Sequence, residues 1–86
     1  MNVYLVSQPK PREGIRLILV IAPSEQAARE MHPLGLSWCQ DHWQGNDTSW
    51  AVPSRLRTKC LGAASMGEVP GVLQAWDQRL RALTRS

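Results

Sequence analysis

A run of apolar residues from Ile15 to Ala22 constrains the fold more than any other stretch of this 86-residue chain. Seven of its eight residues are apolar and several are β-branched, which is typical of a central strand covered on both faces. Pro23 follows directly and ends the strand, because proline has no N–H to donate to a neighbouring strand. The run is too short to span a membrane, so we expect it to be the middle of a β-sheet.

A short helix is predicted directly after this strand. Ser24 can cap its first turn, where the negative charge of Glu25 favours the helix dipole. We expect the helix to end near Met31, because His32 precedes Pro33 and is biased away from helical geometry.

Three other segments are predicted to be strands. Residues 3–7 form an antiparallel hairpin with residues 15–22, since only a proline- and glycine-containing loop separates them. Residues 49–52 form a short strand that ends at Pro53. Residues 55–61 alternate, with the basic side chains and Leu61 on one face, which predicts a strand with a solvated basic face.

The end of the chain has two interpretations on its residues alone. The spacing of its apolar residues fits one amphipathic helix over residues 72–84. Alternatively, residues 72–76 are a strand, and residues 77–86 are a short helical or flexible basic tail. With either ending, the chain is predicted to be a single small α+β domain over residues 1–86. The domain is a mainly antiparallel sheet of about four strands with one main helix packed on one face.

Charge is unevenly distributed along the chain, although the net charge is only +3. Residues 55–86 carry six basic and two acidic side chains, so this end is expected to steer acidic partners. Arg55, Arg57 and Lys59 lie on one face of the predicted strand and could follow phosphates, with Trp50 nearby to stack on a base. The same cations could instead only protect an edge strand from aggregation.

Tryptophan is the most unusual feature of the composition, with four residues and no phenylalanine. Trp76 is expected in the core. Trp38, Trp43 and Trp50 surround a polar loop, and so small a domain cannot bury all three. Tryptophans left at a surface are typical anchors of protein interfaces. The alternative is that one or two are buried to hold the loop.

Metal binding and catalysis are the less favoured interpretations. His32, Cys39, His42 and Cys60 are the possible zinc ligands, but only Cys39 and His42 have a paired spacing. The simpler expectation is that Cys60 is buried and that both histidines are at the surface. Cys39, Asp41 and His42 are sequence neighbours, which does not by itself make a nucleophile with its base. We therefore expect neither an enzyme nor a cofactor.

Several motifs resemble those of short, mostly uncharacterised proteins that bacteriophages and prophages encode. In chain order these motifs are Ala22, Ser24 and Ala28 around the strand-to-helix turn, His32-Pro33 at the helix end, Leu61-Gly62 with Ala64, and Pro70-Gly71-Val72. The tail after Trp76 is longer and more basic than in that group, and the loop before Gly14 is shorter. The resemblance implies that residues 72–76 are a strand.

The resemblance also implies a function, because small phage proteins without enzymatic motifs often bind a host or defence component. Anti-CRISPR proteins are the class most similar in size and character. We therefore expect a non-catalytic inhibitor of a host defence complex. It would act in the host cytoplasm, since no signal peptide is recognised and two cysteines make no disulfide framework. Its expected binding surface comprises Trp38, Trp43, Trp50, Arg55, Arg57 and Lys59.

The expected partner is a host protein or ribonucleoprotein, with no membrane contact. The first alternative is a small nucleic-acid-binding protein that uses the basic face of residues 55–61. The second is a zinc-stabilised domain.

Overall fold

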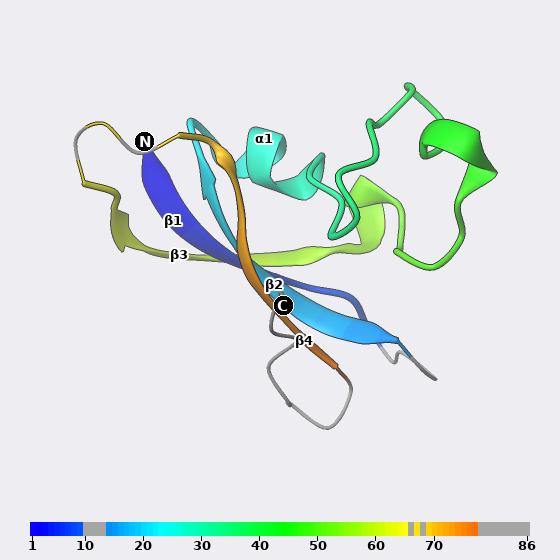
Figure 1. The fold of residues 1–86 in the computed structure, drawn as a ribbon, viewed down its shortest axis with the longest axis horizontal. Helices are drawn as coiled ribbons and strands as arrows, with labels where there is room; N and C mark the ends of the chain where they lie inside the picture. The colour runs from blue at the N-terminus through cyan, green and yellow to red at the C-terminus, as the bar shows by residue number, and fades with distance from the viewer. Residues whose placement is uncertain (10–13, 66, 68, 78–86) are drawn as a thin grey trace.

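A four-stranded antiparallel sheet with one short helix makes up the fold, as the computed structural model shows (Figure 1). The structure describes residues 1–9, 14–65, 67 and 69–77. The strands are β1 (Asn2–Ser7), β2 (Ile15–Ala22), β3 (Arg57–Ala63) and β4 (Gly71–Asp77), in the spatial order β3-β1-β2-β4. The helix is α1 (Glu25–Arg29), and two 3-10 turns, η1 (Gln44–Asn46) and η2 (Pro53–Arg55), follow it. The α+β prediction is confirmed.

The hairpin of β1 and β2 lies at the centre of the sheet. Its register pairs Asn2 with Ala22 and Ser7 with Leu17 without interruption, so every residue of β1 has a partner on β2. The predicted antiparallel hairpin and the central position of residues 15–22 are therefore both confirmed.

One face of the sheet carries the core. α1 and the irregular segment 31–56 lie over this face (Figure 1). Beneath them, Val6, Ile18 and Val20 are fully buried, because alternate residues of a strand point to the same face. On the opposite face Ile21 is buried but Leu19 is only half-buried. Coverage on two sides, which the sequence predicts for β2, is thus complete on the core face from Ile18 to Ala22 and partial on the other face.

The helix begins as the sequence predicts and ends slightly earlier. The Ser24 hydroxyl accepts a hydrogen bond from the Ala27 N–H at 3.1 Å and caps the first turn. Arg29 at the last turn pairs with Glu25 at 2.8 Å, and Glu30 is the C-terminal cap. No helix in the described part of the chain is long and apolar enough to cross a membrane.

The predicted strand at residues 49–52 is wrong, because side chains take the backbone groups that a strand would pair. The Ala51 N–H donates to the Gln8 side chain at 3.1 Å, and the Ala51 carbonyl accepts from the Trp43 indole at 3.1 Å. The η2 turn follows, with Arg55 N–H bonded to the Val52 carbonyl. As a result β3 begins at Arg57 and not at residue 55.

The ending of the described chain is a strand. β4 covers residues 71–77, so the strand interpretation of residues 72–76 is confirmed over the fully helical one. Asp77, predicted to begin the tail, is the last residue of this strand. Residues 78–86 of the predicted tail lie outside the described residues. Trp76, expected in the core, is half-buried.

From this core we expect two apolar truncations to lower the free energy of unfolding by very different amounts. Ile18 is fully buried in the central strand, whereas Leu73 on the edge strand is 51% exposed. Ile18→Ala should lower the free energy of unfolding by about 2–5 kcal/mol, because it leaves a cavity that the sheet cannot close. Leu73→Ala should cost less than about 1 kcal/mol. Urea unfolding followed by circular dichroism measures both, and equal costs would contradict this core.

Candidate functional site

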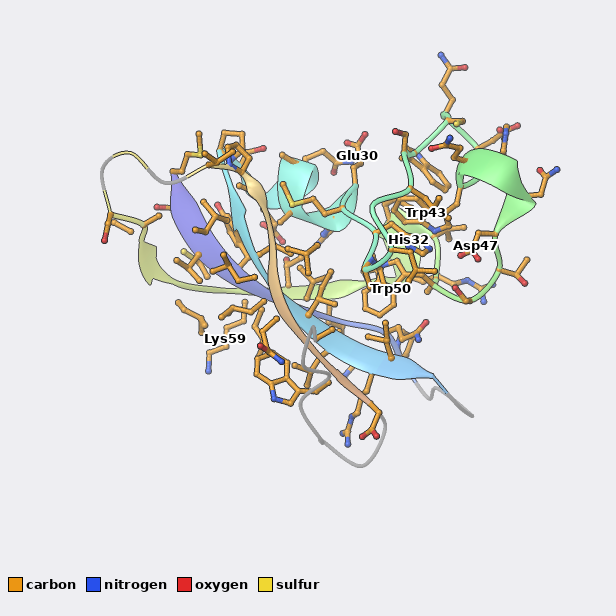
Figure 2. All side chains as sticks on the ribbon, viewed as in Figure 1. Glu30, His32, Trp43, Asp47, Trp50 and Lys59 are labelled. Atoms are coloured by element: carbon orange, nitrogen blue, oxygen red, sulfur yellow. The ribbon has the colours of Figure 1, made fainter. Side chains whose placement is uncertain are left out.

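Trp43 is the centre of the segment 31–56. Its side chain is 1% exposed and makes edge-to-face contacts with two other rings. The His32 ring lies 4.9 Å from it at 78°, and the Trp38 ring lies 5.0 Å from it at 70°. Figure 2 shows His32, Trp43 and Trp50 gathered between the segment and the sheet. Together with its hydrogen bond to Ala51, these contacts fix the indole in place.

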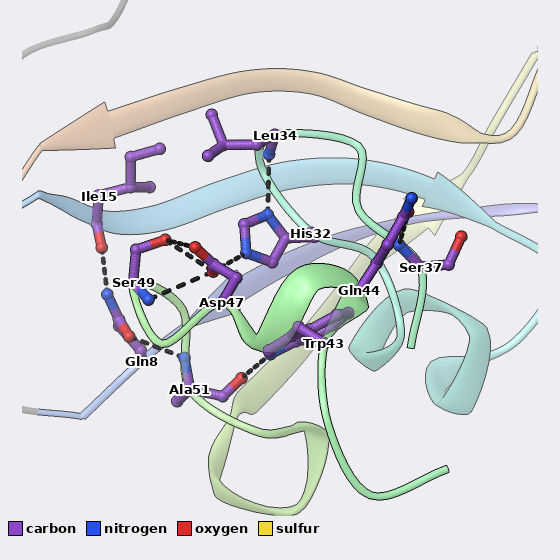
Figure 3. A network of polar contacts seen from close by, with 10 residues as sticks. All are labelled: Gln8, Ile15, His32, Leu34, Ser37, Trp43, Gln44, Asp47, Ser49 and Ala51. Carbon is purple, nitrogen blue, oxygen red and sulfur yellow. Dashed lines mark hydrogen bonds and ion pairs between the residues drawn. The ribbon is translucent and has the colours of Figure 1, made fainter. Parts of the chain in front are cut away.

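A buried histidine connects the start of this segment to a carboxylate 15 residues further along it (Figure 3). The Nδ1 atom of His32 accepts from the Leu34 N–H at 3.0 Å, so the ring proton of the neutral imidazole is on Nε2. Nε2 donates to the Oδ2 atom of Asp47 at 2.6 Å. Both nitrogens of the buried ring are thereby satisfied.

Asp47 is held as a carboxylate by several donors. The backbone N–H of Ser49 bonds to it at 3.2 Å, and the Ser49 hydroxyl bonds to both of its oxygens. Burial alone would raise the pKa of Asp47, but the hydrogen bonds from Ser49 and His32 outweigh burial, and the pKa is lowered. The charge of Asp47 therefore stabilises the folded segment.

Gln8 ties the segment to the central hairpin. Its side-chain oxygen accepts from the Ala51 N–H, and its amide donates to the Ile15 carbonyl (Figure 3). The Gln8 backbone N–H also bonds to the Arg16 carbonyl at 3.0 Å. Gln8, the residue directly after β1, thus fixes the position of Ala51 and, through it, of the Trp43 indole.

An open pocket of about 500 Å³ lies in this segment. Trp43, Trp50 and Val52 contribute apolar wall, while Asp47 and Arg55 contribute charge of opposite sign. Most of the pocket surface is apolar. An apolar wall with a few polar groups is typical of a site that receives a side chain or a small molecule.

The structure divides the predicted binding surface into two parts. Trp43, Trp50 and Arg55 line the pocket, and Trp38 packs on Trp43. The remaining two predicted residues, Arg57 and Lys59, lie opposite Ser7 and Leu5 in the register, on the sheet face away from the core. Figure 2 shows Lys59 on the far side of the sheet from Trp43 and Trp50.

Two tryptophans cannot be the protruding anchors that the sequence predicts. Trp43 and Trp50 are each 1% exposed, because the segment wraps around them and packs them on the sheet. The alternative interpretation, burial of one or two tryptophans to hold the loop, is the observed one. Trp38 is half-buried.

The possible metal ligands are not brought together. Among the described residues, no three histidine, cysteine or acidic side chains lie close enough to hold an ion. The predicted environments of two of them are reversed: His32 is buried and bonded to Asp47, while Cys60 is exposed on β3. His42 is exposed, as expected.

The Cys39–His42 region is an exposed turn. The Cys39 N–H bonds to the His42 carbonyl at 2.8 Å, and Asp41 bonds to the His42 ring. The Cys39 thiol donates to the Ser37 carbonyl at 3.7 Å. These contacts close the turn, and they do not align the thiol with the histidine as nucleophile and base.

The sequence predictions missed the pair of His32 and Asp47 and the role of Gln8. One available signal was the spacing of Asp47 and Ser49, which is typical of an Asx turn and needs the Asp47 carboxylate to face the backbone.

Comparison with protein-family models, with curated proteins and with solved structures found no match to this chain. The interpretation of the site therefore depends on its geometry.

The two buried indoles predict different costs of substitution. The Trp43 N–H has a partner in the Ala51 carbonyl, whereas the buried Trp50 N–H has none among the described residues. Trp43→Phe leaves the Ala51 carbonyl unpaired and should lower the free energy of unfolding by about 1–3 kcal/mol more than Trp50→Phe. Urea unfolding measures the difference. Equal costs would show that the Trp43 hydrogen bond contributes little.

Asp47 predicts a specific pH dependence of stability. Its pKa is lower when folded than the usual value of about 3.9, so its contribution is complete above about pH 4 and is lost as the pH falls through the folded pKa. Asp47→Asn should therefore lower the urea midpoint at pH 7, and this deficit should shrink by pH 3. The control, Asp41→Asn at an exposed carboxylate, should follow the wild type. A deficit independent of pH would contradict the role of the charge.

Proposed function

We propose that this protein is a non-catalytic binding protein that inhibits a host defence complex by occupying its surface. The observation that carries the proposal is the pocket of the segment 31–56. Its surface is mostly apolar, Arg55 contributes a cation, and the buried side chains of Trp43 and Trp50 support it from behind. A preformed pocket of this kind loses little entropy when a partner enters.

The tryptophans then take the opposite role to the one that the sequence predicts. Trp43 and Trp50 are buried behind the pocket and do not themselves enter a pocket of the partner. An anchoring side chain of the partner would contact the half-buried Ala51 and Val52 of the lining. Arg55 is exposed beside them and favours a carboxylate or a carbonyl on the entering group. An apolar side chain next to an acidic group on the partner fits this arrangement.

The resemblance of the sequence to phage and prophage proteins narrows the partner to a host protein or ribonucleoprotein of a defence complex. The same resemblance supports action in the host cytoplasm. Cys39 and Cys60 are both exposed and free, which is compatible with that reducing compartment.

Direct nucleic-acid binding is the second candidate. Arg57 and Lys59 are exposed on one sheet face and can follow phosphates. Trp50, the predicted stacking residue, is buried and cannot contribute. Strong dependence of binding on salt concentration would favour this candidate.

Two pocket variants test the proposal. Thr48 lies at the exposed wall of the pocket, so Thr48→Trp should block it, and Arg55→Glu should reverse its charge. Tagged wild-type protein should retain a host complex from lysate after nuclease treatment, and both variants should retain at least about tenfold less. Quantitative mass spectrometry measures the retained complex.

Ser65→Trp is the control, because it adds the same side chain at an exposed position outside the pocket lining. It should retain as much of the complex as the wild type. Equal retention by both pocket variants would contradict the pocket, and loss of the complex with nuclease would favour nucleic acid.

A further inference from the structure

β3 is an edge strand that is uncovered on most of its length. Within the part of the chain that the structure describes it pairs only with β1, and six of its seven residues are exposed. Lys59 and Leu61 are exposed, and so is Cys60, although Cys60 lies opposite the buried Tyr4 on the core side. The strand therefore presents open surface on both faces as well as along its outer edge.

An edge strand leaves a row of backbone N–H and C=O groups without a neighbouring strand, and another extended chain can pair with it. The register of β3 with β1 is regular from Arg57 to Cys60, where it pairs with Ser7 to Tyr4. The outer side of these residues is therefore straight enough to accept a further strand.

The charges of β3 indicate which kind of strand could bind at this edge. Arg57 and Lys59 lie two residues apart and point to the same face, opposite the uncharged Ser7 and Leu5. Among the described residues, neither cation forms an ion pair with an acidic group. An added strand places every second side chain on this same face, so acidic residues two positions apart would lie beside both cations.

The same charges disfavour a second copy of the chain. Pairing two β3 strands would bring the cations of one copy beside those of the other, which is destabilising. The opposite edge of the sheet does not offer an equivalent site, because β4 carries Asp77 and no basic residue over Gly71–Asp77.

We infer that β3 binds an extended acidic segment of a partner protein, which adds to the sheet as a fifth strand through backbone hydrogen bonds and pairs two acidic side chains with Arg57 and Lys59. The inference rests on the proposed binding function and adds the chemistry of the partner. Its contact is separate from the loop pocket, because Arg57 and Lys59 lie on the opposite face of the sheet.

A synthetic peptide tests this directly. Its seven residues match the length of β3 and contain two glutamates two positions apart among valines and threonines. It should bind the full-length protein in a fluorescence anisotropy titration, and NMR shift changes should be concentrated at the amides of β3. No binding, or shift changes concentrated at β4, would overturn the inference.

Two changes separate the contribution of charge to peptide binding from the contribution of backbone hydrogen bonds. Arg57→Glu with Lys59→Glu should weaken binding of the glutamate peptide about tenfold or more and should allow a lysine version of the peptide to bind. N-methylation of the peptide amides that face β3 should weaken binding at least about tenfold, because it removes the backbone donors. Arg16→Glu is the control, at an exposed position of β2 that β1 separates from β3, and it should leave peptide binding unchanged.

If the methylated peptide bound as tightly as the unmethylated one, the contact would be nonspecific charge attraction, and the inference would be overturned. A single-stranded oligonucleotide that binds more tightly than the peptide, and loses this binding in Arg57→Glu with Lys59→Glu, would show that β3 binds nucleic acid and not an acidic peptide. A dimer in sedimentation that the peptide cannot dissociate would show that a second copy occupies the edge. Each result leaves the pocket variants Thr48→Trp and Arg55→Glu as a separate test of the proposed function.

Discussion

The position of Trp43 determines the shape of a segment that has almost no regular secondary structure. Between α1 and β3, the chain forms two 3-10 turns and loops, so strand or helix hydrogen bonds cannot define its path. The Trp43 indole is instead packed against His32 and Trp38 and bonded to the Ala51 carbonyl. The Gln8 side chain bonds to both Ala51 and the central hairpin, so it holds this loop in a fixed position on the sheet. The pocket depends on these few contacts, because they hold its walls apart.

The same arrangement places two different surfaces on opposite sides of the sheet. The loop side presents the pocket with Arg55, and the far side presents Arg57 and Lys59 on an open edge strand. Only Leu56 separates Arg55 from Arg57, but the change from the η2 turn to β3 sends their side chains to different sides. A partner that contacts both surfaces would therefore have to reach around the edge of the sheet. A partner with an extended segment joined to a globular domain could contact both surfaces in this way.

Elements with strong local signals could be predicted from the sequence. The apolar run of β2, the proline after it and the Ser24 cap act over a few residues, and they gave the hairpin, the helix and the central strand correctly. The loop could not be predicted, because its contacts join residues far apart in the chain. The His32–Asp47 pair and the Gln8–Ala51 pair are 15 and 43 residues apart. Alternation alone placed Arg55 on the strand, since it takes no account of the turn that Pro53 begins.

Native-state hydrogen exchange at the Trp43 indole tests the central claim most directly, which is that the segment 31–56 is held to the sheet as one unit with it. Followed by NMR, the Trp43 Nε1–H and the Ala51 N–H should exchange only through global unfolding, with the same free energy as the most protected amides of β2. Exchange of these two protons through a local opening, at a markedly lower free energy than β2, would contradict the account. The pocket would then be a transient feature of a loop that moves independently of the sheet.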